Sequence, residues 1–260
     1  MKIALVSLNQ YWEDKKSNLV LCEKYIENAS KKSVDLIIFP EMTLTGFSNN
    51  IDLTSENFEN SETIEKFSNL AKEFNISVIF GVVIKDNKKA LNKSIFIDNF
   101  GNILGNYSKV HPFSFSGEDR YFNAGNKISI VKYKDLKIGL TICYDLRFPE
   151  LYSSLAKDCD LIINIANWPS KRVDHWNTLL KARAIENQIF MVGVNRTGID
   201  GNGLEYIESS NIFNANGEKL EFEKYEDMKI YDVDVKFTKD FKNKFNTVND
   251  RKVEFYKEIL

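Results

Sequence analysis

The segment KIGLTICYDLRFPEL (residues 137–151) predicts a strand, a turn and the start of a helix. Its first six residues have the composition of a short strand, and Pro149 suits the first turn of a helix. Cys143 therefore falls on a strand-to-helix turn, where backbone N–H groups and the helix dipole favour a thiolate. A nucleophile is one interpretation of Cys143. A buried structural cysteine is the other, because free cysteines are among the most buried residues.

On either side of this segment, short apolar runs bounded by polar residues or glycine predict further strands, and apolar stripes of helical period predict helices. The strands are expected at Ile3–Leu8, Asp35–Phe39, Ile76–Val83, Ser94–Asp98, Ile103–Ser108, Ile128–Tyr133, Lys137–Ile142, Leu161–Ile165, Ile189–Val194, Ser210–Asn214 and Lys229–Val233. The helices are expected at Trp12–Lys31, Glu62–Phe74, Pro149–Lys157 and Asp174–Gln188. This alternation favours a mixed α/β sandwich with helices on its outer faces. No linker divides the chain, so we expect one domain over residues 1–260.

The composition is that of an ordinary globular chain, with 43% hydrophobic and 28% charged residues. A formal net charge of −2 offers no basic field to nucleic acid or anionic lipid, so neither is expected as a partner. No apolar run is long enough to span a membrane, and no secretory signal is recognised. Three scattered cysteines indicate a reducing cytoplasm, and two histidines argue against a metal site. We therefore expect catalysis without metal or cofactor.

Two more candidates for chemistry follow predicted strands. Glu41 comes after Asp35–Phe39, and ligands bind at the carboxyl ends of strands in open α/β sheets. A carboxylate there could serve as general base and general acid. Lys109 comes after Ile103–Ser108, where an ammonium could stabilise an oxyanion. Each residue alone could be an ordinary loop residue, but a base, a cation and a thiol that all follow strands predict a shared site.

One further glutamate and the two histidines of the chain are also candidates for catalysis. Glu118 is a candidate of the same kind as Glu41, in the stretch GEDR (residues 117–120). A cysteine–histidine pair would need His111 or His175, and neither has an evident orienting partner in the sequence. The sequence therefore favours the glutamate and the lysine over a histidine as the groups that act with the cysteine.

Three motifs resemble those of the nitrilase superfamily of carbon–nitrogen hydrolases. FPEMTLTGF (residues 39–47) resembles the glutamate motif of that family, YSKVH (residues 107–111) its lysine motif, and ICYDLRFPE (residues 142–150) its cysteine motif. The motifs occur in the family's order, and the resemblance extends from the first strand through Val235.

The resemblance implies a four-layer α-β-β-α sandwich, often assembled as a homodimer through helices. It implies that Glu41 takes the thiol proton while Cys143 attacks the amide carbon. Lys109 and the backbone N–H of Tyr144 would hold the oxyanion. Glu41 would then protonate the departing ammonia and activate water to hydrolyse the thioester, and Glu118 would position substrate or water and support Lys109.

Within the superfamily the sequence is most similar to bacterial omega-amidases, which hydrolyse 2-oxoglutaramate and related monoamides of dicarboxylic acids. The supporting stretches are NWP (167–169), HW (175–176), ARAIENQ (182–188) and NRTGIDGNG (195–203). These enzymes usually continue with Tyr, a short linker and Gly-Asp-Ser, whereas this chain has YIESS (206–210). The alternatives are an N-carbamoyl hydrolase, a deaminated-glutathione amidase, an acyltransferase, or a non-catalytic redox-sensing binding protein.

A substrate of this class retains one carboxylate, which a planar guanidinium can bind through two hydrogen bonds. Arg147 is the favoured partner, with Lys171 and Arg172 next. Arg147 could instead form a structural ion pair with Glu150, three residues further on. Trp168 follows a predicted strand and could either form a wall of the substrate pocket or belong to the core.

Overall fold

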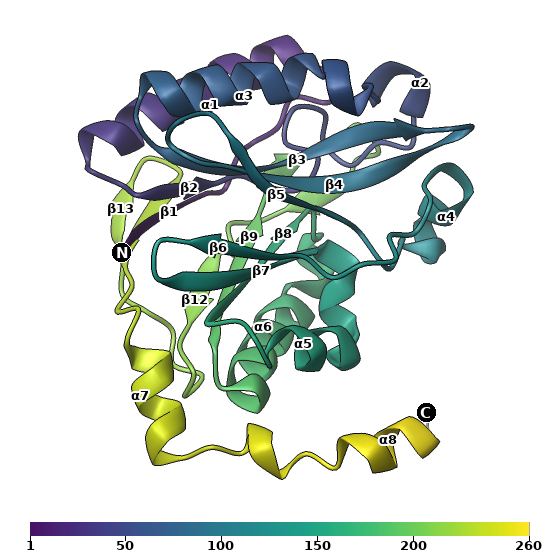
Figure 1. Ribbon diagram of the computed structural model, residues 1–260. Coiled ribbons are helices and arrows are strands. Elements are labelled where there is room, and N and C mark those ends of the chain that lie inside the picture. Colours follow the sequence, from purple (N-terminus) through teal and green to yellow (C-terminus); the bar gives the residue numbers. More distant parts are fainter. Residues whose placement is uncertain (260) are drawn as a thin grey trace.

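The computed structural model describes residues 1–259, which form two packed β-sheets, each covered by helices on its outer face (Figure 1). The larger sheet has the strand order β13-β14-β1-β2-β3-β4-β5. Its strands are β1 (Lys2–Val6), β2 (Leu36–Ile38), β3 (Ser77–Asp86), β4 (Lys89–Ile97), β5 (Ile103–Ser108), β13 (Glu223–Tyr225) and β14 (Met228–Asp232). Strands β1, β2 and β3 are parallel, and the other neighbours pair antiparallel.

The smaller sheet has the order β12-β9-β8-β7-β6, with β7, β8 and β9 parallel. Its strands are β6 (Ile130–Tyr133), β7 (Leu136–Ile142), β8 (Leu161–Ala166), β9 (Phe190–Asn195) and β12 (Asn211–Phe213). A separate two-stranded ribbon consists of β10 (Gly198–Ile199) and β11 (Glu205–Tyr206). Each sheet therefore has a set of parallel strands with a common carboxyl edge, where side chains from different strands can meet.

Four helices complete the layers. The helices α1 (Lys15–Lys31) and α3 (Glu62–Glu73) cover the larger sheet, whereas α5 (Pro149–Leu155) and α6 (Val173–Asn187) cover the smaller one (Figure 1). The C-terminal tail extends past α5 and α6 (Figure 1). The remaining helices are α2 (Ile51–Thr54), α4 (Glu118–Tyr121), α7 (Phe237–Lys244) and α8 (Val253–Ile259).

Burial on both faces of the larger sheet explains its apolar strands. Along β1, Ile3 and Leu5 join the core between the two sheets, while Ala4 and Val6 join the core beneath α1 and α3. Alternate residues of a strand point to opposite faces, so a strand covered on both sides must be apolar throughout. The predicted four-layer α-β-β-α sandwich is confirmed.

Several predicted boundaries differ from the structure. Helix α1 begins at Lys15 rather than at Trp12, because the Asp14 side chain caps it by accepting from the Ser17 backbone N–H at 3.0 Å. Strand β4 begins at Lys89 rather than at Ser94, while β5 has the predicted bounds. Helices α7 and α8 and the short strand β13 were not predicted.

None of the helices within residues 1–259 combines the length and apolar character needed to cross a bilayer. The same residues contain no group of three or more His, Cys, Asp or Glu side chains arranged to hold a metal ion.

Candidate active site

Glu41 lies in the turn after β2, and its side chain is completely buried. The Gln10 amide fixes this turn, because its Nε2 lies 3.2, 2.9 and 3.0 Å from the carbonyl oxygens of Glu41, Met42 and Thr43. Met42 has a φ of 45°, in the left-handed region. Across the turn, Gly81 of β3 leaves no room for a side chain, since a Cβ there would be 2.3 Å from the Met42 nitrogen. The position of Glu41 is therefore tightly determined.

Lys109 follows β5 and lies between two carboxylates. Its Nζ is 3.0 Å from Glu41 Oε1 and 2.8 Å from Glu118 Oε2. The Phe47 ring covers the ammonium, with 5.4 Å between Nζ and the ring centroid. Burial by itself would lower the pKa of Lys109, but the Glu118 and Glu41 carboxylates raise this pKa well above its ordinary value. Lys109 therefore carries its positive charge at neutral pH.

Asn92 of β4 joins the same cluster and was missed in the sequence. Its Nδ2 donates to Glu41 Oε1 at 2.7 Å and to Glu118 Oε1 at 3.1 Å. The two carboxylates are thus held by a neutral donor as well as by Lys109. The predicted strand begins at Ser94, next to the apolar run at residues 95–97, and so leaves Asn92 outside it. A strand prediction that extended back to Lys89 would have placed Asn92 inside β4, and a polar amide within a buried strand would have marked it as a candidate site residue.

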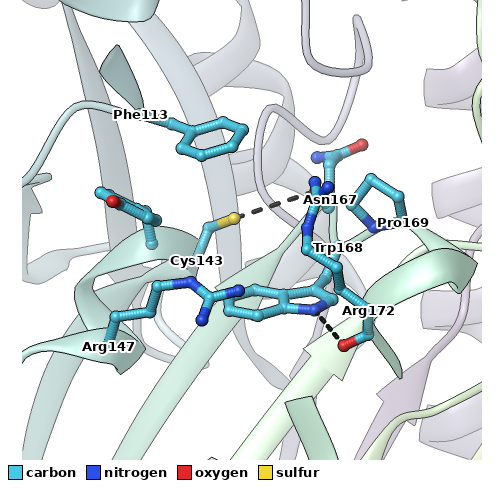
Figure 2. A pocket seen from close by; sticks show the side chains of 8 residues that line it. Phe113, Cys143, Arg147, Asn167, Trp168, Pro169 and Arg172 are labelled. Atoms are coloured by element: carbon cyan, nitrogen blue, oxygen red, sulfur yellow. Dashed lines mark hydrogen bonds between the residues drawn. The ribbon is translucent and has the colours of Figure 1, made fainter. Parts of the chain in front are cut away.

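Cys143 is the first residue of the 3₁₀ turn η3 (Cys143–Arg147), directly after β7. Its φ of 46° lies in the left-handed region, which L-residues adopt at a cost and which occurs often at functional sites. The sulfur lies 3.8 Å from the Asn167 carbonyl oxygen (Figure 2). The backbone N–H of Asn167 donates to Glu41 Oε2 at 2.8 Å. The thiol and the carboxylate thus contact the backbone of one residue at the end of β8.

The expectation that the turn favours a thiolate is wrong for the resting protein. Burial raises the pKa of the Cys143 thiol well above its ordinary value, and the Glu41 carboxylate raises it further. The Lys109 ammonium acts in the opposite direction without reversing the shift. The thiol is therefore protonated at neutral pH, and a nucleophilic role requires a nearby base.

Asp145 anchors the turn that carries the cysteine. Its carboxylate accepts from the Ile142 N–H at 3.0 Å, the Tyr107 hydroxyl at 2.8 Å and the His111 backbone N–H at 3.0 Å. The His111 ring nitrogen Nδ1 lies 2.8 Å from the same carboxylate. Asp145 is completely buried and joins the end of β7 to the end of β5. This contact helps to keep the cysteine turn next to the lysine, and the sequence alone had not singled it out.

A small pocket opens over the cysteine sulfur (Figure 2). Three residues proposed from the sequence as substrate-binding, Tyr144, Arg147 and Trp168, line it together with Cys143. The complete lining consists of Phe113, Cys143, Tyr144, Arg147, Asn167, Trp168, Pro169 and Arg172. The structure therefore brings all of these candidates to one cavity.

Arg147 does not pair with Glu150 in the described chain. Its guanidinium lies over the Trp168 ring, with 4.7 Å between Cζ and the ring centroid, and its Nη2 is 3.3 Å from His175 Nδ1. Trp168 is 3% exposed and still forms a pocket wall, so both interpretations of it apply. Lys171 is exposed and does not line the pocket.

The histidines make contacts that do not involve the thiol. His111 has a partner that sequence reasoning did not find, since its Nδ1 contacts Asp145 and its ring stacks on Phe148 at a centroid distance of 3.7 Å. His175 contacts Arg147. Within residues 1–259, Cys143 has no hydrogen bond to either histidine. The structure therefore gives no support to a cysteine–histidine pair.

A four-layer sandwich with a buried carboxylate, ammonium and thiol at its strand ends is the arrangement expected of the nitrilase superfamily. A family model described as carbon-nitrogen hydrolase matches residues 2–242. The chain belongs to this family, and it is a hydrolase that acts on carbon–nitrogen amide bonds.

Individual relatives agree with this assignment. An omega-amidase of Yersinia enterocolitica is 35% identical over 84% of this chain and 83% of its own length. A 2-oxoglutaramate amidase of Bacillus subtilis is 34% identical over 70% of each chain. The crystal structure of a CN-hydrolase superfamily protein from Xanthomonas campestris, with an arsenic adduct in its active site, has a TM-score of 0.89. That protein is 29% identical, and the match covers 96% of this chain and 97% of the other.

Proposed function

We propose that this protein is a thiol amidase that hydrolyses a small omega-amide such as 2-oxoglutaramate to the acid and ammonia, through a cysteinyl thioester. The observation that carries the proposal is the meeting of Glu41 and Cys143 at the backbone of Asn167, with Lys109 beside Glu41. A base, a nucleophile and a fixed cation then share one buried site beneath a small pocket.

The first step converts the neutral thiol into a nucleophile. Glu41 accepts the Cys143 proton as the sulfur attacks the amide carbon, and the C=O electron pair moves onto oxygen. Lys109 and the backbone N–H of Tyr144 stabilise that oxyanion. A preorganised donor of this kind is worth about 10²–10³ in rate in other hydrolases. Because Lys109 is positive at neutral pH, it needs no proton transfer to serve in this way.

The second step releases ammonia and then the acid. Glu41 returns its proton to the amide nitrogen as the C–N bond breaks, which leaves a thioester on Cys143 and a carboxylate on Glu41. That carboxylate takes a proton from water, whose oxygen attacks the thioester carbon, and the proton passes to the departing sulfur. Glu118 contacts Lys109 and the Phe113 backbone N–H, and it orients the ammonium throughout.

The substrate class follows from the pocket and from the relatives. Arg147 lines the pocket, and among residues 1–259 its guanidinium contacts His175 but no carboxylate, so it can bind the carboxylate of a dicarboxylic acid monoamide. The Yersinia omega-amidase and the Bacillus 2-oxoglutaramate amidase support the same substrate class.

The test measures ammonia release by the purified protein from 2-oxoglutaramate and succinamate. We expect turnover of both, loss of turnover in Cys143→Ala, and an acyl adduct on Cys143 by mass spectrometry of rapidly quenched reactions. Cys159→Ser is the matched control, because Cys159 is a buried thiol away from the pocket. Good activity on another amide but none on these two would reject the substrate. Transfer of the acyl group to an added amine instead of water would identify an acyltransferase.

We further propose that the chain forms one domain, works in the cytoplasm and assembles as a homodimer through its helices. The cytoplasmic location is supported by Cys22, Cys143 and Cys159, which are all free thiols. The dimer is supported by apolar side chains on the outer helical face, where Ile185 of α6 is 46% exposed and Tyr256 of α8 is 42% exposed.

A further inference from the structure

Arg172 is a second guanidinium at the pocket over Cys143. It is half-buried at the end of a short 3₁₀ turn, just before α6. Its guanidinium makes no hydrogen bond and no ion pair with any residue that the structure describes. Five N–H donors on a half-buried side chain are normally satisfied by protein groups when the residue has a structural role. Arg172 therefore has its whole hydrogen-bonding capacity available at the pocket.

The backbone at Arg172 is nevertheless well fixed. Its carbonyl oxygen accepts from the Trp168 indole N–H at 2.7 Å, and its own N–H donates to the Pro169 carbonyl at 3.0 Å. The side chain extends over the Phe113 ring, with 5.7 Å between Cζ and the centroid. A guanidinium held on an aromatic ring keeps its in-plane N–H groups free for a ligand. The residue is thus fixed in place with its donors free.

Arg147 and Arg172 approach the pocket from opposite sides (Figure 2). Each lies against an aromatic ring, and within residues 1–259 neither is within 4 Å of a carboxylate. Two cations that line one small cavity repel each other, and the apolar walls reduce the screening of that repulsion. An anion bound between them would offset this repulsion and accept hydrogen bonds from the N–H groups of both guanidinium groups.

We propose that Arg172 acts with Arg147 as a clamp on a single substrate carboxylate, so that Arg172 determines specificity for linear amides that carry a carboxylate at the far end. This inference rests on the proposed amidase function and extends it to the residue that recognises the substrate carboxylate. Arg172 takes no part in the proton transfers, so its effect falls on substrate binding and not on the chemical step.

The experiment compares two amides of equal length, glutaramate and pentanamide, which differ by a carboxylate in place of a methyl group. Wild-type enzyme is expected to prefer glutaramate. Arg172→Met is expected to raise KM for glutaramate by about 10–100-fold, as for other charged hydrogen bonds, with kcat within about twofold and pentanamide unaffected. Arg172→Lys is expected to recover only part of the lost affinity, because lysine keeps the positive charge but lacks the planar, two-pronged donor geometry of a guanidinium. Lys171→Met, a neighbouring cation outside the pocket, is the matched control.

Two outcomes would overturn the clamp while leaving the amidase intact. One is a wild-type enzyme with no preference between the two amides, and the other is an Arg172→Met variant that loses both activities equally. If neither amide is hydrolysed, the proposed function fails and calorimetric binding of glutarate still decides the clamp. If Arg172→Met binds glutarate at least about tenfold more weakly than wild type, the clamp is supported. Equal binding by the two proteins, or no binding by wild type, would refute the clamp.

Discussion

The resting Cys143 thiol keeps its proton in a buried site beside Glu41. Burial and the nearby carboxylate both raise the pKa of Cys143, with burial the larger cause. In the proposed mechanism the nucleophile therefore forms only when Glu41 accepts the proton as the substrate is attacked. This differs from a turn that stores a thiolate, which the sequence alone had suggested.

The proton arrangement predicts an unusual result for Glu41→Gln. Removal of the carboxylate charge lowers the pKa of Cys143, so alkylation by iodoacetamide at neutral pH should become faster. Turnover should fall by about 10²–10⁴-fold, because the general base is lost. The alkylation rate is followed from about pH 6 to about pH 10, with the modified residue located by mass spectrometry and Cys143→Ala as the blank. Slower alkylation in Glu41→Gln would contradict this account.

Asn92 gives a second prediction at this scale. Its amide donates to both carboxylates of the cluster, so Asn92→Ala leaves each of them without one charge-assisted hydrogen bond. Since such bonds contribute about 1.5–3 kcal/mol, kcat should fall by about 10–100-fold with little change in KM. Asn106→Ala, an exposed asparagine on the neighbouring strand, is the control for steady-state assays. An unchanged kcat in Asn92→Ala would show that Lys109 and the backbone N–H groups of Asn167 and Phe113 position the carboxylates without it.

Single residues also show the limits of sequence reasoning. The sequence singled out Glu41, Lys109 and Cys143 as candidates, because each is a chemically distinctive residue within a few positions of a strand end. Asn92 and Asp145 could not, because their roles depend on contacts between segments far apart in the chain. The orienting partner of His111 was missed for the same reason, since Asp145 belongs to another turn.

Among the elements, the turn after β2 depends on close approach by β3. A Cβ at Gly81 would lie 2.3 Å from the Met42 nitrogen and 2.9 Å from the Glu41 Cα, so Gly81→Ala must displace the turn. We expect kcat to fall at least tenfold, because small displacements of a catalytic group are costly. The free energy of unfolding should fall by about 1–3 kcal/mol, measured by chemical denaturation.

The control for this prediction is Gly139→Ala in β7. A Cβ there would meet the side chains of Cys159 and Ile162 at 3.1 Å, where side chains can adjust without moving Glu41. Stability should then fall while kcat changes little. Equal loss of kcat in both variants would mean that activity follows general stability and not the position of this turn.

The elements that could be predicted are those buried on a regular face. Strand β5 has its predicted bounds, and α1 and α3 occur where apolar residues recur with helical spacing. Helix α8 was missed, because its apolar residues are largely exposed. Helix α7 was missed although its Phe237 packs against the core, because its eight residues are too few for a clear helical pattern. Phe255 and Ile259 of α8 are 56% and 61% exposed.

The whole molecule should be a dimer through the outer helical face that carries Ile185 of α6 and Tyr256 of α8. In sedimentation or light scattering, its mass should be twice the 30.1 kDa of one chain. Ile185→Glu should shift the protein towards monomer, since a charge would be buried at an apolar contact. Phe100→Glu, at an exposed phenylalanine of the β4–β5 turn, should leave the mass unchanged. A wild-type monomer at micromolar concentration would reject this assembly.

At this scale the sandwich could be predicted from the alternation of strands and helices and from the family resemblance. The pairing of the layers depends on which side chains fill the space between the sheets. Residues as distant as Leu5 of β1 and Ile163 of β8 share that core. Sequence patterns indicate that both are buried, but they do not indicate that the two are neighbours.

The Asn167 backbone touches a thiol supplied by one sheet and a carboxylate supplied by the other. The proposed proton relay therefore spans the seam between two halves of the molecule, and no single half contains it. Loosening of that seam by heat or denaturant would separate donor from acceptor while both sheets kept their hydrogen bonds. Enzyme turnover is then a more sensitive gauge of how tightly the halves are held together than any spectroscopic measure of strand content.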